Sequence, residues 1–435
     1  MLAVLANVTY RRLLTAQIVA LFGTGLATVA LALLAYDLAG ENAGAVLGTA
    51  LFIKMIAYVG ISPFAGVIVT LVPRKALLVA MDVVRLAIAL LLPFVTEIWQ
   101  VYILIFALQS ASAVFTPTFQ AIIPDVLPDE NDYTRALSLS RLAYDLENLL
   151  SPTIAAVLLL AINFHWLFAG TALGFLVSAM LVLTVALPEP VSDKQPTSFL
   201  EKATRGIRIY LATPRLRGLL ALNVTVAFAG AMVIVNTVVI VRSLLAGSQS
   251  DVGFAMATFG AGSIVAALAV PRLLQRVADR TIMLAGAAVL AILMVVTALM
   301  VATLDAGLWL GLLLAWPLMG LSSSMIQTPG GRLLKRSTHS EDRPAVFAAQ
   351  FALSHACWLI AYPLAGWLGS SMGISLTFTL LSAPALLGCL AAFWLWPPES
   401  DGIIEHTHDN LSARDPHWAE GTPTAHRLPY VLFSD

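Results

Sequence analysis

Residues 281–303 read TIMLAGAAVLAILMVVTALMVAT, a stretch without a single charged side chain. A helix needs about 20 consecutive apolar residues to cross the hydrocarbon core of a bilayer, so this stretch predicts a membrane-spanning helix. The whole chain has the same character, because 59% of its 435 residues are hydrophobic and 11% are charged. An ordinary soluble domain has about 25% charged residues. The sequence therefore predicts an all-α integral membrane protein, and it excludes a soluble, a disordered and a nucleic-acid-binding chain.

Apolar stretches of this length recur twelve times along the chain. They form two sets of six, separated by a polar stretch at 188–215 and followed by a polar tail. The predicted spans are residues 13–38, 44–71, 76–95, 100–123, 133–161, 164–187, 216–245, 252–274, 281–303, 307–329, 344–369 and 373–397. We therefore expect twelve transmembrane helices in two six-helix pseudo-symmetric bundles.

Four parts follow from this division of the chain. They are an N-terminal six-helix bundle (1–187), a cytoplasmic linker (188–215), a C-terminal six-helix bundle (216–397) and a His-bearing cytoplasmic tail (398–435). Apolar residues recur at helical spacing within the linker, with basic residues between them. This pattern favours an amphipathic helix on the membrane surface over a plain flexible connection.

The basic residues predict the orientation of the chain. With the N-terminus inside, 21 of the 24 lysines and arginines fall in inside segments, and the exceptions are Lys54, Arg85 and Arg242. Cytoplasmic loops carry an excess of Lys and Arg, so both termini of a multi-pass membrane protein are expected in the cytoplasm.

The two sets of spans end alike in two places. The second span ends in Val72-Pro73-Arg74 and the eighth in Val270-Pro271-Arg272; the fourth and tenth end in Thr116-Pro117 and Thr328-Pro329. These matches are short, but with the span count they favour two similar bundles that face each other. Substrate sites of such repeats lie near the bilayer midplane, between the repeats.

The chain resembles the major facilitator superfamily at the loop after the second span. Residues 66–75 read GVIVTLVPRK, and Gly66, Arg74 and Lys75 match the family signature Gly-x-x-x-Asp-Arg-x-Gly-Arg-Arg/Lys. Thr70 and Leu71 replace its acidic and first basic residues. In the family these two charges help to latch the cytoplasmic side, so the departure puts that latch in doubt here.

A narrower resemblance is to bacterial drug- and siderophore-exporter-like members of that family. It is carried by residues 117–125 (PTFQAIIPD) and 211–217 (LATPRLR). This resemblance implies a place in the inner membrane of a bacterium. The tail, which contains Glu405-His406-Thr407-His408-Asp409, resembles the His-bearing tails of some members, nickel-resistance exporters among them.

Ionisable residues inside predicted spans are costly, and each is a functional candidate by default. Lys54 lies well inside the second span with Tyr58 on the same face, and it is either a group for substrate anions or proton coupling or half of a structural ion pair. Glu147 lies near the middle of the fifth span, where a carboxylate could load and release a proton. His355 in the eleventh span is either a hydrogen-bonded core residue or a proton switch, since histidine changes charge between pH 5 and 8.

Other polar residues inside the spans have weaker claims. Arg141 and Asp145 at i, i+4, and Asp82 and Arg85 at i, i+3, are interpreted as structural or gating pairs. Residues of the helices that line the cavity in the resembled family are candidates to line it here, although small polar residues serve helix packing equally well. These candidates are Gln17, Gln109, Asn223, Asn236 and Gln327.

The tail histidines form a candidate metal site. His406, His408 and His417 could bind nickel or zinc, or the tail could be a solvated, mobile end. No phosphate-binding loop, hydrolase or zinc-enzyme motif is present, so we expect neither an enzyme nor a cofactor, and export would need ion coupling.

The sequence is interpreted first as a proton-coupled efflux carrier, an antiporter that exports a small amphipathic solute by alternating access. Its expected partners are that solute, protons and the lipid bilayer, with no nucleic acid, and it is expected to be a monomer. Two alternatives stay open: a nickel or cobalt exporter whose tail collects the ion, and a non-transporting membrane scaffold or sensor.

Overall fold

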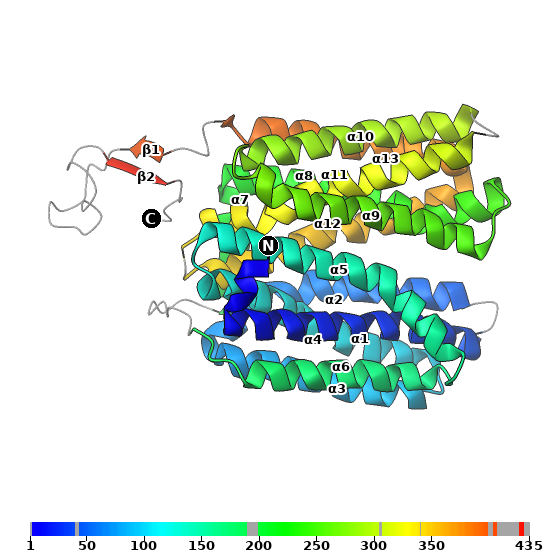
Figure 1. The fold of residues 1–435 in the computed structure, drawn as a ribbon, viewed down its shortest axis with the longest axis horizontal. Helices are drawn as coiled ribbons and strands as arrows, with labels where there is room; N and C mark the ends of the chain where they lie inside the picture. Colours follow the sequence, from blue (N-terminus) through cyan, green and yellow to red (C-terminus); the bar gives the residue numbers. More distant parts are fainter. Residues whose placement is uncertain are drawn as a thin grey trace.

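The computed structural model describes residues 2–39, 43–188, 199–303, 307–339, 341–398, 403–406 and 426–429. Nearly all of this part of the chain is helical (Figure 1). The long helices are α1 (Val8–Ala39), α2 (Ala43–Leu71), α3 (Arg74–Leu91), α4 (Ile98–Val126), α5 (Glu130–Leu159), α6 (His165–Leu183), α8 (Pro214–Val239), α9 (Gln249–Leu273), α10 (Asp279–Thr303), α11 (Leu308–Arg336), α12 (Arg343–Met372) and α13 (Ile374–Leu395). The shorter elements are η1 (Leu2–Ala6), η3 (Leu92–Phe94), α7 (Phe199–Ala212), the π-helical turn η4 (Ile240–Leu244), β1 (Ile403–His406) and β2 (His426–Pro429).

Eleven helices in the described part of the chain are long and apolar enough to cross a membrane. These helices confirm a multi-pass, helical membrane protein. The fifth predicted span corresponds to α5, which has 30 residues but is not one of the eleven. It carries Glu130, Asp132, Arg135, Arg141, Asp145 and Glu147. A twelfth span therefore stays a prediction that depends on α5.

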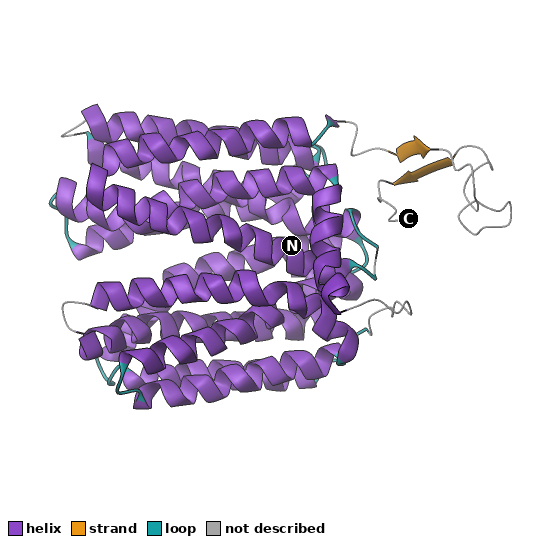
Figure 2. Ribbon diagram, turned by 180° about the vertical axis from the view of Figure 1, so that it is seen from behind, coloured by secondary structure: helices purple, strands orange, loops and turns teal. Residues whose placement is uncertain are grey.

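The long helices lie in two groups (Figures 1 and 2). Helices α1–α6 lie together on one side, and α8–α13 lie on the other. In the first group α1 packs on α6 and α2 on α4; in the second, α9 packs on α11 and α8 on α13. The two groups meet where α2 packs on α12 and α5 on α9, and α7 lies against both α12 and α2.

Two glycines let α2 and α7 approach the first turn of α12. A Cβ on Gly66 would lie 2.7 Å from the Ala345 Cα, and one on Gly206 would lie 2.1 Å from the Ala345 carbonyl oxygen. One turn along, the Ser62 hydroxyl donates a hydrogen bond of 2.8 Å to the Ala348 carbonyl. The signature glycine Gly66, near the end of α2, therefore lies where the two helix groups touch.

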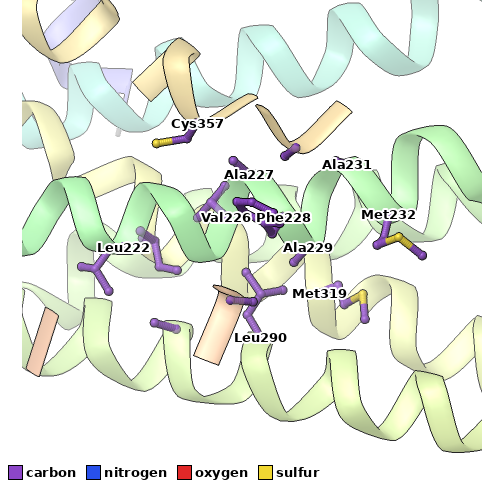
Figure 3. Close-up of a cluster of buried hydrophobic side chains, with 14 of the residues drawn as sticks. Leu222, Val226, Ala227, Phe228, Ala229, Ala231, Met232, Leu290, Met319 and Cys357 are labelled. Atoms are coloured by element: carbon purple, nitrogen blue, oxygen red, sulfur yellow. The ribbon is translucent and has the colours of Figure 1, made fainter. Parts of the chain in front are cut away.

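The second group packs around α8 (Figure 3). Leu222, Phe228 and Met232 of α8 are buried against Leu290 of α10 and Met319 of α11. Lipid tails are as apolar as these side chains, so close van der Waals packing rather than the hydrophobic effect holds such helices together. Cys357 of α12 belongs to the same cluster, and its role here is packing.

The tail contains more regular structure than the sequence predicts. Strands β1 and β2 pair antiparallel, with His406 opposite His426. His408 and His417 lie outside the described residues. In the described part of the chain, no group of three or more His, Cys, Asp or Glu side chains is placed to hold a metal ion.

Candidate functional site

Lys54 and Tyr58 project from the same face of α2, near the middle of the helix. The Lys54 ammonium lies 5.5 Å from the centroid of the Tyr58 ring. An aromatic ring attracts a cation placed over its face. Both side chains are half-buried, so Lys54 is held inside the protein and partly compensated by the ring.

His355 of α12 meets this pair from the other helix group. Its ring packs edge-on against Tyr58 at 4.8 Å and tilted against Phe351 at 4.1 Å, centroid to centroid. The His355 Nδ1 lies 2.7 Å from the Phe351 carbonyl oxygen. That oxygen can only accept, so Nδ1 carries the hydrogen of this bond and a neutral ring keeps Nε2 free to accept a proton.

Glu147 of α5 is the acidic group of this cluster. It interacts electrostatically with Lys54 and with Tyr58, and Lys54 in turn interacts with His355. The interaction of Glu147 with Lys54 is through space, without an ion pair within 4 Å between these two described side chains. The structure thus gathers Lys54, Tyr58, Glu147 and His355, the central cluster, from three helices and both groups.

Gly25 of α1 lets α5 come close enough to deliver Glu147. A Cβ on Gly25 would lie 2.2 Å from the Ser151 Cβ and 3.5 Å from the Glu147 Cγ. No side chain at position 25 fits without moving α5. Nothing in the sequence marks Gly25, because a small residue in an apolar helix gives no signal of its own.

The Asp82–Arg85 pair is enclosed by the first group. Arg85 forms an ion pair with Asp82, whose second oxygen accepts a 2.8 Å hydrogen bond from the Ser178 hydroxyl. The Arg85 guanidinium also lies over the Phe115 and Phe175 rings, at 4.1 and 4.6 Å. These partners all belong to α3, α4 and α6, which fits a structural role.

The Arg141–Asp145 pair joins the two groups through Ser263 of α9. Arg141 contacts Asp145 at 3.0 Å and donates a 2.9 Å hydrogen bond to the Ser263 hydroxyl. That hydroxyl donates to Asp145 at 2.7 Å, and Arg141 also donates to Gln327 at 3.1 Å. Gln327, a candidate to line the cavity, therefore contacts the junction of α5, α9 and α11.

Asp125 at the end of α4 forms a second junction. It accepts from Arg74 of α3 at 2.7 Å and forms an ion pair with Arg343 at the start of α12. Beside it, the Lys335 ammonium donates to the Pro128 carbonyl at 2.7 Å. Polar contacts between the groups thus gather at one end of the molecule, which we name the basic end: the α4–α5 loop, the end of α11 and the start of α12.

Glu130 extends this junction from the first turn of α5. It pairs with Arg332 at 2.7 Å and with Arg336. Arg336 also donates to the buried Asp279 of α10 at 2.8 Å. From the sequence these arginines indicate only the membrane orientation, because spacing along one chain does not reveal partners on distant helices.

The remaining predicted residues are spread over both groups. Gln17 accepts a 3.1 Å hydrogen bond from the Ser140 hydroxyl, and Gln109 is buried in α4. Asn223 donates to Leu219 of its own helix at 3.0 Å, whereas Asn236 donates to Ala365 of α12 at 3.1 Å. The two asparagines therefore have packing partners, and their role in lining a cavity stays a prediction.

Known proteins of similar sequence place the chain in a family. The family model of the Major Facilitator Superfamily matches residues 13–244 and 219–413. An uncharacterised MFS-type transporter of Bacillus subtilis is 22% identical over 211 residues, 48% of this chain and 50% of that protein. Macrolide efflux protein A of Streptococcus pyogenes is 26% identical over 153 residues, 33% of this chain and 38% of that protein. The chain spans about half the length, or less, of these curated relatives.

Solved structures agree on the fold. The human organic anion transporter MFSD10 superposes with a TM-score of 0.71 at 12% identity, covering 88% of this chain and 98% of that one. A bacterial homologue of the iron transporter ferroportin superposes with a TM-score of 0.73, also at 12% identity, covering 89% and 99%. The match of the family model over most of the chain confirms the resemblance noted at residues 66–75, and the chain belongs to the Major Facilitator Superfamily.

Proposed function

We propose that the chain is a secondary transporter that exports a small amphipathic solute in exchange for protons by alternating access. The observation that carries this proposal is the central cluster, where Lys54, Glu147 and His355 come together from both helix groups near the middle of their helices. Substrate sites of two-fold repeats lie at such an interface, and ionisable groups inside a membrane mark ion pathways.

Proton binding at Glu147 would bias the two groups toward one conformation. While Glu147 is ionised, its charge compensates that of Lys54; once it is protonated, Lys54 is left uncompensated. An uncompensated charge inside the membrane is expensive unless water reaches it. Protonation therefore favours the state in which the cluster is open to water on one side, and a ligand that binds the states differently shifts their populations.

The proposed membrane topology rests on the contacts of α5 and on the distribution of basic residues. We propose that α5 is the twelfth span, because its charged residues have partners inside the protein rather than facing lipid. The molecule then consists of two six-helix bundles joined by the linker that holds α7. The basic end faces the cytoplasm by the positive-inside rule, so both termini are cytoplasmic and the structure is closed to the inside. The proposed location is the inner membrane of a bacterium, as a monomer.

The substrate class rests on the relatives and on the lining of the cluster. A matched relative is a macrolide efflux protein, which favours export of an amphipathic organic solute. Tyr58 and Phe351 offer aromatic faces beside the charges, as expected of a pocket that is mostly apolar with a few polar groups.

Proteoliposomes with a transmembrane pH gradient test this function. With acid on the side opposite the basic end, we expect uphill movement of a radiolabelled macrolide toward the acid side. Glu147→Gln should abolish the dependence on the gradient but keep downhill counterflow, because the substitution removes the titrating group and leaves the substrate path. Glu341→Gln, an exposed acid at the basic end, is the matched control. If Glu147→Gln moves the macrolide along the pH gradient at the wild-type rate, Glu147 is not the coupling residue. If no member of a panel of amphipathic solutes shows protein-dependent flux, the proposed transport function is wrong.

A further inference from the structure

A basic pocket opens at the basic end, between the start of α5 and the end of α9. Its volume is about 770 Å³. Arg135 of α5 lines one wall, and Arg272, Gln275 and Arg276 line the other. The pocket therefore brings together positive side chains from both helix groups.

The arginines of this pocket differ from those of the nearby junctions. Arg74, which has the matching place in the other repeat, is buried and paired with Asp125. Arg272 and Arg276 are exposed, and the described residues provide neither with an ion pair. Arg135 pairs with Asp132 at 2.9 Å, both side chains being about one-third or more exposed, and exposed pairs of this kind hold an arginine only weakly. The pocket is thus positively charged and open to an anion.

Apolar side chains continue the pocket toward the lipid. Leu268 and Leu273 line it and are each 42% exposed. Both belong to α9, a helix long and apolar enough to cross a membrane. A ligand in this pocket would meet arginines at its polar end and leucines at its apolar end.

We propose that this pocket binds the phosphate group of an anionic phospholipid. Guanidinium groups bind phosphate with paired, charge-assisted hydrogen bonds, and the Gln275 amide adds a donor. Basic pockets between membrane helices on the cytoplasmic side suit lipid head groups. The choice of the inner leaflet rests on the orientation proposed above, whereas lipid binding itself does not.

The bound lipid would tie the two helix groups together. Its phosphate would bridge α5 and α9, the helices that Arg141 and Ser263 already join. A ligand that contacts both groups only when they are closed at this end stabilises the closed state. Anionic lipid is then a regulator of the transport cycle, separate from the transported solute.

Native mass spectrometry of the purified protein tests the site without any transport. Phosphatidylglycerol and phosphatidylcholine are titrated in detergent against wild type, Arg272→Ala/Arg276→Ala and the control Arg11→Ala/Arg217→Ala. The control removes two exposed basic side chains of the same end outside the pocket. We expect wild type and control to prefer phosphatidylglycerol, and the pocket variant to bind it at least tenfold more weakly, with unchanged melting temperatures because neither arginine holds an ion pair.

Two results would overturn the proposal. Equal phosphatidylglycerol binding by the pocket variant and wild type would remove the site. Soluble glycerol 3-phosphate serves as the competing probe; if it binds as tightly as the lipid, the pocket recognises a free phosphate ester and the lipid assignment is wrong. If wild type binds phosphatidylglycerol at this pocket but transports no solute in proteoliposomes, the proposed transport function is wrong and the lipid site stands.

Discussion

In the proposed mechanism, Lys54 and Glu147 carry opposite charges inside the membrane protein and each compensates the charge of the other. Removing one partner leaves a buried charge uncompensated, which is more costly than removing both. We expect Lys54→Ala and Glu147→Gln each to lower thermal stability in detergent and the double variant to recover part of the loss. Comparing the two single variants with the double variant, as a double-mutant cycle, should give an interaction energy between Lys54 and Glu147 of about 0.5–3 kcal/mol, as found for neighbouring groups. Additive effects of the two substitutions on melting temperature would show that the charges do not interact.

Helices α1 and α5 can approach each other only because residue 25 has no side chain. A Cβ there would lie 2.2 Å from Ser151, whereas one on Gly60 of α2 would meet nothing within 4 Å. We expect Gly25→Ala to destabilise the protein by about 1–3 kcal/mol, as overpacking does, and to weaken gradient-driven transport by displacing Glu147. Gly60→Ala is the matched control and should leave melting temperature and transport unchanged. Equal behaviour of the two variants would contradict the close approach of α1 and α5.

At the scale of the whole molecule, Asp125 links the two helix groups at the basic end, where it receives Arg74 from one group and Arg343 from the other. We expect Asp125→Asn to shift the population toward states open at this end, because the closed state loses the charge-assisted contact with Arg343 across the two groups. A shift of about 1.4 kcal/mol corresponds to a tenfold change in population.

The measurement uses a cysteine at position 69, introduced as Val69→Cys after both native cysteines are replaced. Val69 is buried between the groups beside Ala348, so an impermeant maleimide supplied at the basic end reaches it only when that end opens. Labelling should be about tenfold faster in Asp125→Asn than in Glu341→Gln. Identical labelling rates in these two variants would mean that Asp125 does not hold the end closed.

The long helices were predictable because each signal lies within one stretch of chain. The predicted spans 281–303 and 44–71 differ from α10 (Asp279–Thr303) and α2 (Ala43–Leu71) by two residues or fewer. A length of apolar residues matched to the bilayer suffices for such a prediction. Lys54, Glu147 and His355 were found for the same reason, since a charge within an apolar run stands out without knowledge of its neighbours. Their role in proton coupling stays a prediction.

The contacts between helices could not be predicted in this way. The sequence placed Arg272 and Arg74 alike at the ends of matching spans, yet only Arg74 is buried in an ion pair. It gave no sign that Ser263 would bridge Arg141 and Asp145, or that Gly25 would admit α5. By itself the sequence determined the membrane environment, the helices and the short set of charges inside them, because hydropathy is a local property. Only the tertiary structure decided which charges of different helices meet, because such partners lie far apart in the chain (51 residues for Arg74 and Asp125, 218 for Asp125 and Arg343) and are brought together by packing.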